Sequence, residues 1–166
     1  MHAFATAGAA ALLALALPAA TPDAGLAPLA FLAGHCWRGT FHDGKTTDEH
    51  CFSWIYHGKF MRDRHVVRTP GAPDGFGESI YLWDAATQQL QYLYIESGGG
   101  FSRGSVTAEG TTLVFPQSTY SEGGKTQTIR SRWTRAGGDG YDVSTEFQGK
   151  DGWVPGFALH MQRVGP

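Results

Sequence analysis

Residues 35–68 read HCWRGTFHDGKTTDEHCFSWIYHGKFMRDRHVVR, and this stretch decides the fold. Runs of alternating apolar and polar residues are separated by Asp43-Gly44 and by His57-Gly58. Alternation is typical of half-buried strands, and Asp-Gly between two extended runs is a strong hairpin signal. The stretch therefore predicts three antiparallel strands, at about residues 35–42, 45–56 and 60–68.

The same pattern continues to the end of the chain. Short alternating runs are separated by turns rich in Gly, Pro and Asp, and no convincing helical period interrupts them. The further strands are expected at about 76–83, 89–97, 101–107, 111–118, 125–134, 140–148 and 152–164. An antiparallel meander of this length has exposed edges unless it closes, and closure into a barrel removes them. We therefore expect an all-β fold: one closed antiparallel meander barrel of about ten strands, wide enough to enclose a cavity.

The first residues differ from the rest. Residues 3–20 form an apolar run that ends in small residues, which is typical of a secretory signal peptide. No Lys or Arg precedes the run, so a buried or membrane-anchored helix is the alternative. We expect a signal peptide over residues 1–20 and a barrel domain over 21–166. The mature protein would then be periplasmic or secreted, without a stable membrane span. Residues 26–34 predict a short helical plug that ends at Gly34.

The first hairpin sets a strand register. If Asp43-Gly44 is a two-residue turn, residues whose numbers sum to 87 lie opposite each other, and Cys36 and Cys51 satisfy that sum. Opposed Cα atoms are about 4.5–5.5 Å apart, within disulfide range. We therefore expect a Cys36–Cys51 disulfide. A zinc site at the repeated His-Cys dipeptides is disfavoured, because His50 and Cys51 point to opposite faces of a strand.

The second hairpin, at His57-Gly58, gives pairs that sum to 115. His65 then lies opposite His50, and Asp63 lies opposite Phe52. With Trp37 facing inward, its partner His50 faces inward too, as does Trp54. The sequence thus predicts an inward cluster of His50, Asp63 and His65 beside aromatic walls. The cluster has three interpretations: hydrogen-bonded core residues, ligand contacts or catalytic groups.

Tyr81, Tyr92 and Tyr94 alternate along the fourth and fifth strands and share one face. If that face points inward, their hydroxyls supply the few polar groups typical of an apolar pocket. The opposite face is equally apolar, so periodicity alone leaves the choice open. Arg130 and Arg132 alternate on one face of the eighth strand. Periodicity also leaves open whether that face is exposed to solvent or points inward to bind a carboxylate.

The two ends of the chain carry a resemblance. The segments LAPLAFLAGHCW (26–37) and ALHMQRV (158–164) resemble the opening and the final strand of bacterial lipocalin-like barrels of the calycin superfamily. That likeness implies that Arg163 lies over Trp37 in a cation–π contact that closes one end of the barrel. Trp37 follows Gly34 by three positions, where typical lipocalins have two.

A second resemblance is to the ten-stranded, haem-binding nitrobindins, through PLAFLAG and the strand count. That family uses a His near the C-terminus as the proximal haem ligand. The matching residue here would be His160, so this likeness would imply haem as a cofactor.

The net charge of −2 gives no global field that would recruit nucleic acid. No spacing defines a nucleophile–base set, a metal site or a nucleotide-binding loop. We therefore expect an exported, non-catalytic barrel, without a cofactor, that binds a small apolar or amphiphilic molecule. The alternatives are a haem protein, an enzyme that uses the interior His cluster, and a barrel with a filled core. The predicted ligand-contacting residues are His50, Trp54, Asp63, His65, Tyr81, Tyr92 and Tyr94.

Overall fold

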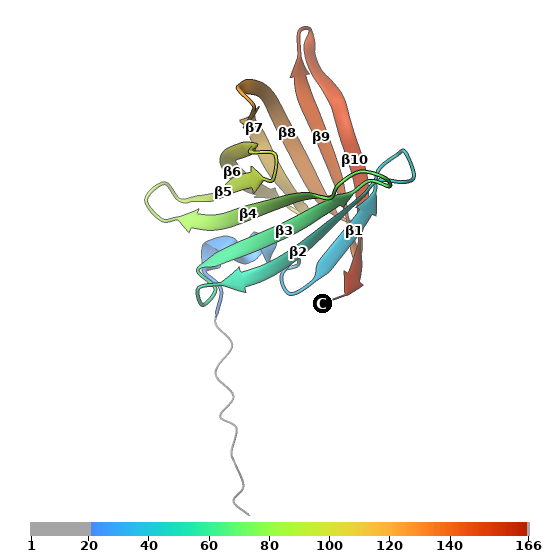
Figure 1. Ribbon diagram of the computed structural model, residues 1–166. Coiled ribbons are helices and arrows are strands. Elements are labelled where there is room, and N and C mark those ends of the chain that lie inside the picture. The colour runs from blue at the N-terminus through green and yellow to red at the C-terminus, as the bar shows by residue number, and fades with distance from the viewer. Residues whose placement is uncertain (1–20, 166) are drawn as a thin grey trace, which may run out of the picture.

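The computed structural model describes residues 21–165 and shows an all-β chain with one short helix (Figure 1). The 3₁₀-helix η1 spans Ala24–Leu29. The strands are β1 (Cys36–Thr40), β2 (Thr47–Ile55), β3 (Phe60–Arg68), β4 (Gly75–Asp84), β5 (Gln89–Glu96), β6 (Phe101–Glu109), β7 (Thr112–Glu122), β8 (Lys125–Arg135), β9 (Gly140–Gly149) and β10 (Gly152–Gly165).

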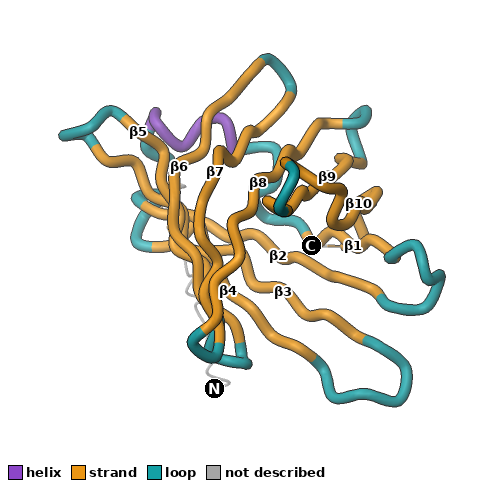
Figure 2. The backbone as a smooth tube through the Cα atoms, turned by 90° about the horizontal axis from the view of Figure 1, so that it is seen from above, coloured by secondary structure: helices purple, strands orange, loops and turns teal. Residues whose placement is uncertain are grey.

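The strands form a closed barrel. Each strand pairs antiparallel with the next along the chain, and β1 pairs with β10 to complete the ring. Figure 2 shows that strands and their connecting loops make up almost the whole backbone. The predicted ten-stranded meander barrel is confirmed.

The first hairpin has the predicted register but not the predicted turn. Cys36 lies opposite Cys51 and Trp37 opposite His50. However, the Phe41 N–H donates to the Thr46 carbonyl, so the loop comprises residues 42–45. Gly44 has a φ of 68°, whereas Asp43 is not in the left-handed region, so the two-residue type I′ turn was wrong. The longer loop has the same centre, and the strand register is therefore unchanged.

The second register is also confirmed, since His50 lies opposite His65 and Phe52 opposite Asp63. Side chains alternate across each strand, so this pairing brings His50, Asp63 and His65 to one face. That face is the interior: Asp63 and the neighbouring Met61 are almost completely buried, at 1% and 0% exposure.

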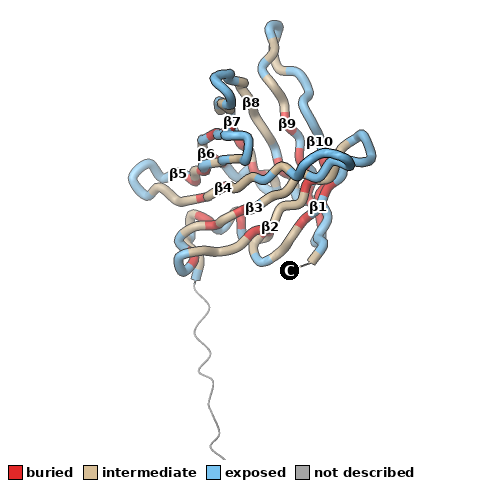
Figure 3. The backbone as a smooth tube through the Cα atoms, viewed as in Figure 1, coloured by how far each residue is buried: buried red, intermediate tan, exposed pale blue. Residues whose placement is uncertain are grey.

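The N-terminal helix fills one end of the barrel, as predicted, but it spans Ala24–Leu29 and ends before the expected stop at Gly34. It packs against β3, β4 and β5, and its Leu26 and Leu29 are completely buried. Gly25 lies so close to β4 that a Cβ there would come within 2.0 Å of the Trp83 ring. The helix can therefore approach the barrel only with glycine at this position. Buried residues lie along the strands, whereas the hairpin tips are exposed (Figure 3).

The seam between β1 and β10 joins the two ends of the chain. Trp37 lies opposite Arg163, whose guanidinium carbon is 5.2 Å from the centroid of the Trp37 ring. The Trp37 Nε1–H donates to the Leu32 carbonyl (3.3 Å), which ties the ring to the segment after the helix. On β1 and β2, Cys36 and Cys51 form a disulfide with Cα atoms 4.1 Å apart.

Within residues 21–165, no helix is both long and apolar enough to cross a membrane. The signal peptide expected over residues 1–20 lies outside the described residues.

Candidate functional site

The barrel encloses a cavity of about 360 Å³ at the end away from the helix. This volume is near the lower end of the usual range for small-molecule sites. Its wall is largely aromatic, and the rings come from strands all around the barrel. The aromatic lining residues are Tyr81, Tyr92, Tyr94, Phe115, Tyr120, Trp133, Phe147 and Phe157.

The three predicted tyrosines therefore lie on the interior face. Tyr81 and Tyr92 are 2% and 9% exposed, whereas the outward-facing Leu93 and Ile95 are 43% and 50% exposed. Trp54 does not line the cavity, and instead packs against the buried core. The site thus includes all the predicted ligand-contacting residues except Trp54.

One polar wall interrupts the aromatic lining, and His50 lies at its centre. The His50 Nδ1–H donates to Asp63 Oδ2 (2.8 Å), and the Nε2–H donates to Asp48 Oδ2 (3.1 Å). Both ring nitrogens therefore face carboxylates, and this arrangement favours the doubly protonated imidazolium. β2 supplies Asp48 and His50 at alternate positions, and β3 supplies Asp63.

His65 continues this wall toward β5. Its Nδ1–H donates to Asp48 Oδ1 (2.9 Å), and its Nε2 lies 3.1 Å from the Tyr94 hydroxyl. The His50 and His65 rings stack with centroids 4.6 Å apart. Gly77, opposite His65 on β4, makes room for the ring, because a Cβ at Gly77 would lie 1.9 Å from His65 Nε2.

The carboxylates determine the charge of His50. Burial alone would lower the pKa of His50, but Asp63 and Asp48 outweigh it and raise that pKa to about 10. For Asp48, burial alone would raise the pKa, but His50 and His65 outweigh it and lower that pKa well below its usual value. Asp48 and His50 are therefore both charged at neutral pH.

The tyrosines nearby remain protonated. Burial raises the pKa of Tyr81 and of Tyr141, and the negative charge of Asp63 raises both further. Burial, followed by Glu96, raises the pKa of Tyr94. Protonated phenols can each donate a hydrogen bond, so the tyrosine side of the cavity offers neutral donors.

Two buried polar atoms of the described residues have no hydrogen-bond partner in this region. They are Asp63 Oδ1, which belongs to a residue that lines the cavity, and the hydroxyl oxygen of Tyr141. Buried polar groups in native proteins nearly always have partners, so each such atom requires an explanation. The charge of Asp63 acts on Tyr141 and helps to raise its pKa, so both atoms belong to the same enclosed region of the barrel interior.

Asp48 was missed from the sequence, although it is 7% exposed and contacts both histidines. The signal was present, because Asp48 has the same even-numbered parity on its strand as His50 and therefore the same inward direction. The small hydroxyls were also missed: the Tyr92 hydroxyl lies 2.9 Å from Ser118 Oγ across the cavity.

His160 lies on the outer face of β10. Its Nδ1 is 2.6 Å from Asp142, its side chain is half exposed, and it does not line the interior cavity. A haem inside the barrel would therefore not have His160 as its ligand. The side chains of the two arginines of β8 are 42% and 51% exposed, and they pair with Glu146 (Arg130, 2.6 Å) and Glu109 (Arg132, 3.1 Å). Arg130 also contributes to the cavity lining.

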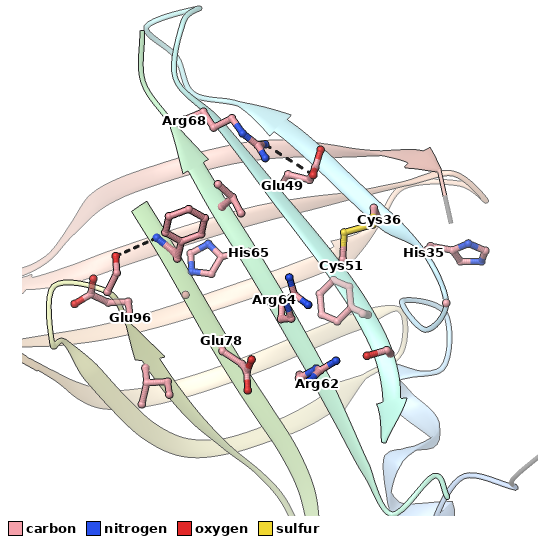
Figure 4. A pocket seen from close by; sticks show the side chains of 18 residues that line it. His35, Cys36, Glu49, Cys51, Arg62, Arg64, His65, Arg68, Glu78 and Glu96 are labelled. Atoms are coloured by element: carbon pink, nitrogen blue, oxygen red, sulfur yellow. Dashed lines mark hydrogen bonds and ion pairs between the residues drawn. A yellow bond between two sulfur atoms is a disulfide. The ribbon is translucent and has the colours of Figure 1, made fainter. Parts of the chain in front are cut away.

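A second hollow, of about 800 Å³, lies on the outer face of β2, β3 and β4 (Figure 4). Side chains of both charge signs border it, including Arg62, Arg64 and Glu78, and the disulfide lies at one side. Arg68 and Glu49 pair across its rim at 3.8 Å. This hollow lacks the aromatic enclosure of the interior cavity, which is the better candidate for a small-molecule site.

No protein-family model matches the chain, and no curated protein matches it. The closed antiparallel ring of ten strands is consistent with a calycin-like barrel. With its interior cavity, the fold is compatible with ligand binding.

Proposed function

We propose that this protein is an exported, lipocalin-like barrel that binds a small amphiphilic molecule in its interior cavity without catalysis. One observation carries the proposal: a cavity of about 360 Å³ has rings around most of its wall and one ionised patch. An apolar body fits between rings such as Phe115 and Trp133. A polar head fits beside the polar wall, where Asp48, His50 and His65 line the cavity.

The cluster contacts favour binding over acid–base chemistry. A general base needs a free lone pair within reach of its substrate. Both nitrogens of His50 face carboxylates, and both nitrogens of His65 have partners in Asp48 and Tyr94. The network therefore resembles a fixed polar wall, in which each ring is held by two neighbours.

Export is supported by the disulfide and by the apolar run over residues 3–20. Disulfides form and persist in oxidising compartments, including the periplasm and the extracellular space. Intact-mass measurement of protein from the periplasm or medium tests this part. We expect no thiol to react with an alkylating reagent before reduction, and a mass that lacks residues 1–20 or nearly so.

The binding experiment uses N-phenyl-1-naphthylamine, a neutral probe that fluoresces in apolar sites. Ile129 lines the cavity, and the Ile129→Trp variant fills part of it. We expect saturable binding near one probe per chain for the native protein, and at least tenfold weaker binding for this variant. The matched control is Thr128→Trp, one residue away on the opposite face of β8, which should bind normally.

A third variant, Met61→Trp, distinguishes the filled part of the barrel interior from the hollow part. Met61 is completely buried and does not line the cavity, so added bulk there overpacks a solid region. We expect a loss of about 1–3 kcal/mol in unfolding free energy. Ile129→Trp should keep a nearly native melting temperature. Equal probe binding by both β8 variants would disprove the interior site.

A further inference from the structure

We propose that Asp48, His50 and His65 form a binding site for a divalent transition-metal ion, with Zn²⁺ as the reference ion, in the wall of the interior cavity. The inference does not depend on the proposed amphiphile, because an ion at this wall needs only the three side chains.

The spacing of the ligand atoms fits an ion. One nitrogen from each imidazole and a carboxylate oxygen of Asp48 all lie within 4.8 Å of one another. Zinc bonds to nitrogen and oxygen measure about 2.0–2.2 Å, so neighbouring ligands in a tetrahedral site are roughly 3.4 Å apart. His50 Nε2 lies 3.1 Å from Asp48 Oδ2, and His65 Nδ1 lies 2.9 Å from Asp48 Oδ1. Each nitrogen thus contacts a different oxygen of the same carboxylate, which can bind an ion through one oxygen or through both.

The rings also need to turn. The two imidazoles stack with an interplanar angle of 19°, whereas the lone pair of each nitrogen lies in its ring plane. Both lone pairs face one ion only after the rings turn about χ2. Both histidines line the cavity, with side chains 14% and 11% exposed, so the rings can turn toward it when the ion replaces their present hydrogen bonds.

The charge balance favours a divalent ion. Metal-binding imidazoles are neutral, so the two histidines with Asp48 and Asp63 carry a formal charge of −2. A divalent cation cancels it, and it replaces the N–H hydrogens that face Asp48. Buried carboxylates require such compensation. In the metal-free protein the His50 imidazolium between Asp48 and Asp63 supplies part of it, and a bound ion would take over that role. Both Asp48 and Asp63 are at least nine-tenths buried.

Asp63 supplies an independent indication. In metal sites, the second nitrogen of a ligating histidine commonly donates to a carboxylate, which orients the ring. Asp63 Oδ2 is in this position relative to His50 Nδ1, at 2.8 Å. Its other oxygen, Oδ1, is buried, lacks a partner among the described residues and belongs to the same cavity wall.

The donor atoms select the class of ion. Imidazole nitrogen suits zinc, copper, nickel and iron, whereas Mg²⁺ and Ca²⁺ prefer sites made entirely of oxygen. A set of two imidazoles and one carboxylate therefore favours a first-row transition ion. The fourth position, toward the cavity, is left for water or another small ligand.

The test is calorimetric titration of the chelator-treated, untagged protein with Zn²⁺ alone, followed by absorption spectroscopy with Co²⁺. We expect one Zn²⁺ per chain and visible Co²⁺ bands typical of a low-coordinate site. Asp48→Asn and His65→Gln should each weaken Zn²⁺ binding at least tenfold, and Asp63→Asn should weaken it about 10–100-fold. Mg²⁺ and Ca²⁺ should not compete.

The matched control is His160→Gln, which removes a histidine that also faces a carboxylate, at 2.6 Å, but on the outer surface. This variant should bind Zn²⁺ as the native protein does. Circular dichroism of every metal-free variant checks that it is folded. Absence of stoichiometric Zn²⁺ binding by the native protein, or equal affinity in folded Asp48→Asn and His65→Gln, would overturn the metal site. Retained probe binding in that case would leave the amphiphile site standing.

Discussion

The two ends of the barrel interior obey the same strand alternation and yet differ in content. At the helix end, Leu26, Leu29 and Met61 are completely buried, and Trp37 is 1% exposed. At the other end, the inward residues border a cavity and remain partly accessible, as His50 and Tyr94 do. A barrel of this width is not filled by strand side chains alone. The helix supplies the missing volume at one end only, and the other end is left hollow.

The two ends are also stabilised differently, one by apolar packing and the other in part by charged groups. The helix end is stabilised by close packing of apolar side chains, whose contribution scales with buried area and depends little on pH. The hollow end is stabilised in part by ionised groups, because His50 lies between Asp48 and Asp63. Changes in pH should therefore act on one end, and changes in side-chain volume on the other.

The largest expected effect is the pH dependence of the metal-free protein. The pKa of His50 is raised to about 10, above its unfolded value near 6.5. Below pH 6.5 both states are protonated, and the full stabilisation is present. Between pH 6.5 and about 10 the folded state holds one more proton, so the unfolding free energy falls by about 1.4 kcal/mol per pH unit. Urea unfolding at several pH values, in the presence of chelator, measures this slope.

His50→Gln removes the titrating ring and serves as the control. Its unfolding free energy should show a shallower slope over the same window, since other groups supply the remainder. The contribution of Asp48 to the unfolding free energy has the opposite pH dependence. Its lowered pKa stabilises the folded state above pH 4, and that contribution is lost in stronger acid. Native protein and His50→Gln with equal slopes between pH 6.5 and 10 would mean that the hollow end is not held by charge.

The next effect is a volume deletion made once at each end. Leu29→Ala removes a completely buried side chain from the packed end, and should cost about 2–5 kcal/mol because a cavity remains. Ile129→Ala removes similar bulk from the cavity wall, where no closed void is created. It should cost less than half as much. Chemical denaturation of both variants measures the two losses in unfolding free energy. Equal losses would mean that the two ends are packed alike.

Most of the architecture could be predicted from the sequence, because each step depended on local signals. The paired cysteines and the inward histidines followed from the centres of two hairpin loops. The turn type predicted at Asp43-Gly44 was wrong, but the centre of the loop was right. A loop that is longer by the same number of residues on each side leaves the strand register unchanged. Asp48 had the same parity as His50 and was within reach of the same argument.

The rest required tertiary contacts. Both faces of β4 and β5 are apolar, so only packing shows that Tyr81 and Tyr92 face inward. Trp54 has the parity of the site residues but lies too near the helix end to reach the cavity. Whether the interior is filled depends on how far the helix enters. Gly25 permits that depth because it has no Cβ to clash with the Trp83 ring. No single-strand pattern contains such information.

The smallest expected effect concerns the seam that closes the packed end. Arg163 lies over Trp37, donates to the Gly138 carbonyl (2.9 Å) and is about one-third exposed. Arg163→Ala should cost about 0.5–2 kcal/mol, the usual worth of a cation–π contact, and should lower the melting temperature by a few degrees. Neither Arg163 nor Trp37 lines the cavity, so probe binding should be unchanged. Arg135→Ala, which removes a guanidinium 4.7 Å from the Phe31 ring, is the matched comparison away from the seam. An unchanged melting temperature in Arg163→Ala would remove the case for a calycin-type closure, and lost probe binding would mean that the two ends are coupled.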